Sequence, residues 1–203
     1  MRSTVIGLVA MMVFAGAPQR PAIIANREVR AILIELNADD PQQRGRAFHS
    51  ITSKSEQLAD GVAVILDSET TDEAADRRIL AAKWLALNAP RQGIPVMIRH
   101  VEFSPPSQVI DGLNALSGYP CAEALVTAGL DSVAGIFRFL AGSNEVSNKS
   151  IELYALIINN LYRKHFDQGH GTDAIELLRR TKIRFPGTKN LERLEAALKA
   201  LPR

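Results

Sequence analysis

Two histidines in the last quarter of the chain are the residues whose type and spacing best suit chemistry. His165 and His170 stand five residues apart in a stretch that also contains Asp167 and Asp173. Imidazole and carboxylate groups bind zinc or copper, but helical metal pairs prefer an i, i+4 spacing, and no third ligand is fixed nearby. The stretch also lacks the acidic ligand pattern of a calcium loop. We expect no metal site, although ion binding by 165–173 stays an open alternative.

A second set of polar residues follows an apolar segment near the middle of the chain. Arg99, His100 and Glu102 come directly after Ile98. A histidine on an apolar helix is ordinarily packed or half-exposed, and we favour that interpretation. The alternative is a ligand-binding or catalytic site that uses these three side chains.

Cys121 is the only cysteine, so no internal disulfide can form. Its neighbours Ala122, Ala124 and Leu125 favour a buried, inert thiol, because a reactive thiolate needs exposure and nearby positive charge. Trp84 is the sole tryptophan and fits a core position at helical spacing. No nucleotide-binding, serine-hydrolase or zinc-protease motif is present, so we predict no catalytic, cofactor-binding or metal-binding residues.

Composition indicates one folded domain. The chain has 203 residues, of which 46% are hydrophobic and 23% charged, with a net charge of +2. Residues 163–203 carry ten Lys and Arg against five Asp and Glu. A basic helix end is usually a solvated face, and no aromatic residues stand between the basic ones to stack on bases. We therefore expect no nucleic-acid partner and no cofactor.

The N-terminus resembles a secretory signal. Arg2 precedes an apolar run from Val5 to Ala17, after which small residues lead into Pro18. This run is short for a membrane span, which needs about 20 apolar residues. We predict a signal peptide over residues 1–17, with Ala15 as the favoured cleavage site, and export to the periplasm or the medium. An uncleaved anchor is the alternative, and no integral span is expected.

Apolar residues recur at helical spacing through the rest of the chain, and no run alternates with period two. The stripes and the Pro and Gly breaks predict an all-α fold. The expected helix pairs cover 41–68, 72–103, 119–141 and 147–185. Single helices are expected near 26–37, 107–116 and 188–201, the last as a closing cap.

Two stretches about forty residues apart repeat one pattern, a small-residue helix followed by a second apolar helix. The first covers 81–101 and contains Ile94-Pro95-Val96-Met97-Ile98-Arg99; the second covers 121–140 and contains Val133-Ala134-Gly135-Ile136-Phe137-Arg138. Such units bury both faces only by stacking on copies of themselves.

These residues resemble HEAT-type repeats in the degenerate form of exported bacterial proteins. The resemblance implies a right-handed α-solenoid of about four irregular hairpins over residues 23–203, with a C-terminal capping helix. It also implies a non-enzymatic interaction or scaffold module with a protein partner. We expect the protein itself to be a monomer. The alternative is a HEAT-like protein that binds a ligand or catalyses a reaction on its concave face.

Overall fold

The computed structural model of the protein describes residues 21–36, 38–53, 55–68, 71, 74–106, 115–166, 179–180, 184 and 188–201. At 21–26, 51–57 and 164–166 it describes no side chains. Nine α-helices and no strand occur in this part of the chain, which confirms the predicted all-α class there. The helices are α1 (Pro21–Leu36), α2 (Pro41–Ser53), α3 (Ser55–Ser68), α4 (Ala75–Asn88), α5 (Pro90–Arg99), α6 (Pro120–Ala128), α7 (Asp131–Gly142), α8 (Asn148–Phe166) and α10 (Lys189–Ala200).

Four predictions fall wholly or mostly outside the described residues. They are the signal peptide over 1–17, almost all of the helix expected at 107–116, the 167–173 part of the histidine stretch, and most of the second helix of the pair expected at 147–185. His165 belongs to α8, but its side chain is also outside the description.

Proline and glycine set several helix ends, as the sequence predicts. Pro41 opens α2, and the Asp40 carboxylate accepts a 2.9 Å hydrogen bond from the Gln42 backbone N–H. Pro120 occupies the first turn of α6, and Gly129 ends that helix with a φ of 86°. A positive φ of this size is costly for residues with a Cβ, so glycine suits this position.

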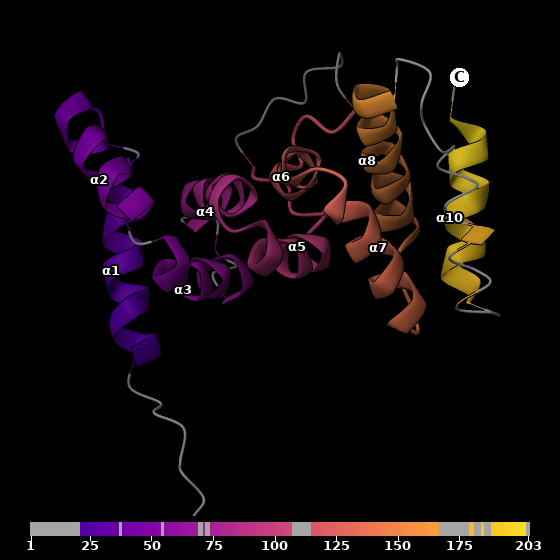
Figure 1. Ribbon diagram of the computed structural model, residues 1–203, viewed down its shortest axis with the longest axis horizontal. Helices are drawn as coiled ribbons and strands as arrows, with labels where there is room; N and C mark the ends of the chain where they lie inside the picture. Colours follow the sequence, from indigo (N-terminus) through magenta and orange to yellow (C-terminus); the bar gives the residue numbers. More distant parts are fainter. Residues whose placement is uncertain are drawn as a thin grey trace, which may run out of the picture.

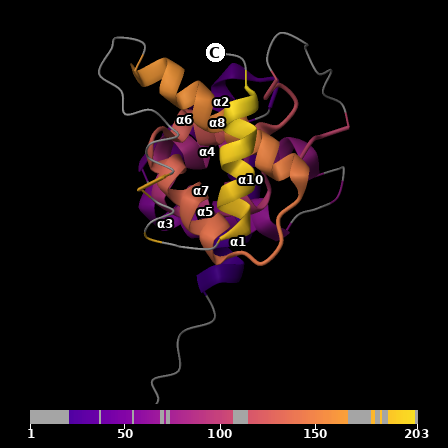
Figure 2. The ribbon, with the colours of Figure 1, turned by 90° about the vertical axis from the view of Figure 1, so that its right-hand side faces the viewer.

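The helices follow one another along the long axis of the molecule, from α1 and α2 at one end to α10 at the other (Figure 1). In the middle, α4 packs on α6 while α5 packs on α7, and α5 also contacts both α4 and α6. The two sequence repeats therefore stack first helix on first helix and second on second. The same order extends outward, because α3 contacts α5 and α8 contacts α6. Figure 2 views the molecule from the α10 end, with α10 in front of the other helices.

The N-terminal pairing differs from the sequence prediction. Residues 41–68 are expected to form one hairpin, but α2 packs mainly on α1 and touches α3 only slightly, while α3 packs mainly on α4 and α1. The reason is visible in α2 itself, where Ala47 is buried and Phe48 is 65% exposed. Among the described side chains of α2, residues 41–50, this leaves little buried apolar surface with which the helix could pack against both α1 and α3.

Close approach of α4 and α5 depends on one glycine. A Cβ added at Gly93 would lie 2.6 Å from the Leu85 Cβ and 3.4 Å from the Leu85 backbone carbonyl carbon. Those atoms belong to the body of α4 and cannot swing away as a side-chain tip can. The small residue at position 93 thus permits the tight packing of the first repeat.

We expect Gly93→Ala to destabilise the protein by about 1–3 kcal/mol through overpacking, against the gain in helix propensity. Gly45→Ala is the matched control, because a Cβ at that α2 position meets nothing within 4 Å. It should instead stabilise by about 0.5–1 kcal/mol. Urea unfolding followed through Trp84, a buried single tryptophan, measures both changes. Equal effects of the two substitutions would contradict the close-approach argument.

Candidate binding groove between α5 and α7

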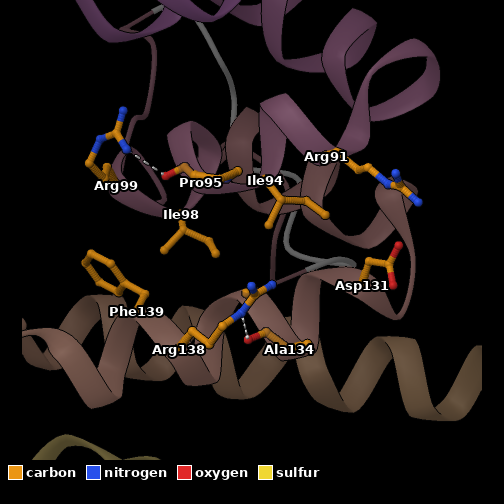
Figure 3. Close-up of a pocket in the computed structure, with 10 residues that line it drawn as sticks. Arg91, Ile94, Pro95, Ile98, Arg99, Asp131, Ala134, Arg138 and Phe139 are labelled. Atoms are coloured by element: carbon orange, nitrogen blue, oxygen red, sulfur yellow. Dashed lines mark hydrogen bonds between the residues drawn. The ribbon is translucent and has the colours of Figure 1, made fainter.

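A groove of about 720 Å³ runs between the second helices of the two repeats. Its floor is apolar and its margins carry three arginines and one aspartate (Figure 3). The lining residues are Arg91, Ile94, Pro95, Ile98 and Arg99 from α5, and Asp131, Ala134, Gly135, Arg138 and Phe139 from α7. Both walls are thus equivalent helices of the repeated unit.

Gly135 brings the two walls together. A Cβ at this position would lie 2.6 Å from the Ile94 Cγ2 and 3.1 Å from the Ile98 Cδ1, so the α7 backbone lies directly against the α5 side chains. Pro95 lies on the exposed side of α5 and has no N–H. The Arg91 carbonyl therefore lacks the donor that an ordinary residue four positions later would supply.

The arginines of the groove differ in their partners. Arg99 donates to the Asp67 Oδ1 of α3, with an Nη2–Oδ1 distance of 3.1 Å, and to the Pro95 carbonyl. Arg138 donates from Nε to the Ala134 carbonyl at 3.3 Å, within its own helix. Neither Arg138 nor Arg91 has an ion pair with any carboxylate among the described residues. Two guanidinium groups thus border the groove without an acidic partner from this part of the chain.

Of the three arginines of the groove, the sequence analysis identified only Arg99 as a candidate site residue. The available signal was the repeat itself, since Arg99 and Arg138 end the two matching hexapeptides. Stacking α5 on α7 brings those equivalent positions to one groove. Arg91 had no such signal, because nothing in its local sequence indicates which face of α5 meets α7.

The polar residues after Ile98 form a different cluster. The His100 Nε2 lies 2.9 Å from the Asp67 Oδ1, and the His100 Nδ1 lies 3.3 Å from the Arg78 Nη2. Arginine can only donate, so Nδ1 accepts and the Nε2–H donates to Asp67. The hydrogen bond from His100, together with Arg99, holds the pKa of Asp67 below its ordinary value. Arg78 is buried, and its guanidinium also stacks 3.8 Å from the centre of the Phe103 ring.

This cluster explains the conformation of the chain after α5. With both ring nitrogens hydrogen-bonded, His100 has no lone pair directed toward a substrate, as a general base requires. Its contacts tie α3, α4 and the end of α5 together. The structure therefore places His100 beside Arg99, yet His100 does not line the groove.

Glu102, the third residue of that predicted set, lies elsewhere. Its Oε1 accepts hydrogen bonds from Ser147 and, at 2.6 Å, from Ser150. These hydrogen bonds hold the pKa of Glu102 below its ordinary value. The Ser150 backbone N–H also donates to the Ser147 Oγ. Through these two serines, Glu102 links the turn after α5 to the start of α8. The three polar residues do not converge on one site.

Cys121 and Trp84 occupy the core, as predicted. Cys121 is fully buried in α6, and burial raises the pKa of its thiol to about 12. We expect native protein to react with Ellman's reagent at least about a hundredfold more slowly than guanidinium-unfolded protein, because only the exposed thiolate attacks. The absorbance of the released thiolate measures both rates. Equally fast labelling in the native state would contradict the burial of Cys121.

Within the described part of the chain, no three His, Cys, Asp or Glu residues gather as metal ligands. No helix there combines the length and the apolar character needed to cross a membrane. No protein-family model, no curated protein and no solved structure matches this chain.

Proposed function

We propose that this protein is an exported, non-enzymatic interaction module that binds a protein partner through the α5–α7 groove. The observation that carries the proposal is the groove itself, in which equivalent helices of two stacked repeats present apolar and cationic side chains together. A mixed surface of this kind suits protein recognition, where apolar anchors contribute affinity and charged margins contribute specificity.

The proposed architecture is a right-handed, HEAT-like α-solenoid of about four irregular hairpins, capped by α10. Its support is the stacking of α4 on α6 and of α5 on α7, the order that a repeat array requires. Export is proposed from the charge and apolar run of residues 1–17.

A small-molecule site is the second candidate, because a volume of about 720 Å³ is within the range of ligand pockets. Of the polar residues Arg99, His100 and Glu102 that the sequence suggested, only Arg99 lines this pocket and could bind such a ligand. A measurable hydrolase, transferase or metal-binding activity that disappears in His165→Ala or His170→Ala would favour an enzymatic alternative over the interaction module.

The proposal is tested by affinity capture from the extracytoplasmic fraction of the native host, with the exported chain as bait. Ala134 is exposed on α7 and lines the groove, so Ala134→Trp should obstruct it and remove the captured protein. Ala196→Trp, on the exposed side of α10, is the matched control and should retain it. Capture that persists in Ala134→Trp, or no specific capture by the unmodified chain, would overturn the proposal.

A further inference from the structure

We propose that the α5–α7 groove recognises an acidic protein segment, with carboxylates at both ends of the groove and an apolar side chain on the floor between them. This inference rests on the proposed function and adds the chemistry of the partner. It is carried by the charge, the floor and the spacing of the lining residues.

The net positive charge of the groove favours an anionic ligand. Three arginines and one aspartate line it, and Arg91 and Arg138 have no carboxylate partner among the described residues. Arg99 is already paired with Asp67, but that pair is half-exposed, so Arg99 can also bind a second carboxylate. Arginine binds carboxylates through paired N–H donors, which makes carboxylate side chains well-matched ligands.

The floor of the groove favours an apolar side chain. Ile94, Ile98 and Ala134 lie between the arginines, and Phe139 closes one side (Figure 3). A purely polar anion would leave this surface in contact with water, whereas an aliphatic or aromatic side chain would bury it. A nucleic acid would place its phosphates and sugars along the whole groove, whereas the proposed segment places an apolar side chain on the apolar floor between two carboxylates.

The spacing distinguishes a protein segment from a single-headed amphiphile. Arg91 and Arg99 are eight residues apart on α5, which corresponds to about 12 Å along a helix. Figure 3 shows them at opposite ends of the α5 wall, with Arg138 between them on the α7 side. One fatty-acid carboxylate cannot reach both ends. Two acidic residues four positions apart in an extended peptide, about 13 Å, can do so.

The test uses a fluorescein-labelled extended peptide in which two Glu residues are separated by three residues, with Leu in the middle. Binding to the full chain is measured by fluorescence anisotropy. We expect Arg91→Ala, Arg99→Ala and Arg138→Ala each to weaken binding by about tenfold, since each removes a charge-assisted hydrogen-bonding group. Arg46→Ala, at an exposed position on α2 outside the groove, should change binding by less than about twofold. Thermal melting of each variant confirms that the fold is retained.

Two altered peptides separate the two parts of the proposal. Replacing both Glu by Gln should abolish the arginine dependence, and replacing Leu by Ala should weaken binding by about tenfold. Binding should also fall several-fold between roughly 50 mM and roughly 300 mM salt, because exposed charges are screened.

Several outcomes would overturn this inference. They are no binding of the acidic peptide, binding that ignores Arg91→Ala, Arg99→Ala and Arg138→Ala, and equal arginine-dependent binding of an oligothymidine or of laurate. If the peptide fails while capture still depends on Ala134, the assigned chemistry is wrong and the interaction module stands. If both experiments fail, the interaction module is also wrong.

Discussion

Deletion of residues 186–203 should destabilise the protein by roughly 3–6 kcal/mol and cause it to aggregate. The physical reason is that α10 packs on α8 and α7. Leu191 and Leu194 are fully buried against α8 and α7, and burying each leucine contributes about 1.5–3 kcal/mol. Without α10, the apolar surface of α7 and α8 would face water.

Polar contacts add to this cover. The Asn190 side chain donates to the backbone carbonyls of Leu140 and Ser143, and Arg193 donates to the Val146 carbonyl. The guanidinium of Arg193 therefore lies on the α7–α8 connection. The buried Asn190 was not anticipated.

Point substitutions on α10 separate loss of its packing from loss of chain length. Leu194→Asp places a charge at a fully buried position and should reproduce most of the effect of the deletion. Ala196→Asp, at an exposed position of the same helix, should cost only about 0.5 kcal/mol of helix propensity. Differential scanning calorimetry and light scattering measure stability and aggregation. A truncated chain that melts like the full chain would contradict the role of α10 as a cap.

Tyr154→Ala is the second large effect, and we expect a loss of about 3–5 kcal/mol. Tyr154 is 1% exposed in α8 and packs edge to face on Phe139, with ring centres 6.2 Å apart. Its hydroxyl donates to the Ile98 carbonyl at 2.9 Å. Tyr154 therefore connects α8 to the end of α5, and through Phe139 it supports one side of the groove.

Two conservative variants divide this loss into its parts. Tyr154→Phe keeps the ring and removes the buried hydrogen bond, which should cost about 1 kcal/mol. Tyr119→Phe is the matched control, because Tyr119 is half-buried and has no hydroxyl hydrogen bond among the described residues. Its loss should be near zero. Urea unfolding followed through Trp84 measures each variant, and equal values for Tyr154→Phe and Tyr119→Phe would contradict the Ile98 contact.

Much of the fold could be predicted from local patterns. The stripe Val133, Ile136, Phe137 and Leu140 lies buried on α7, as its spacing predicts, because a helix with a 3.6-residue period places these positions on one face. Pro41, Pro120 and Gly129 act at helix ends for equally local reasons. Cys121 is buried because its neighbours are small and apolar on the same short helix.

The partners of polar side chains could not be predicted in the same way. Asp67 and His100 are thirty-three residues apart, and Glu102 and Ser150 forty-eight, so their hydrogen bonds depend on how whole helices dock. A side chain's type restricts what it can bind, but the choice among many possible partners is made by packing. This is why Arg99 and His100 share Asp67, whereas Glu102, only two residues further along, is bound by Ser147 and Ser150.

The sequence by itself determined that this chain forms helices and that two stretches share one pattern, because periodicity and breaking residues are local properties of the chain. Only the tertiary structure decided that α5 meets α7 through Gly135 and that Arg91, Arg99 and Arg138 share one groove. The physical reason is that helix docking depends on close packing summed over many side chains, so small residues at remote positions decide which exposed charges become neighbours.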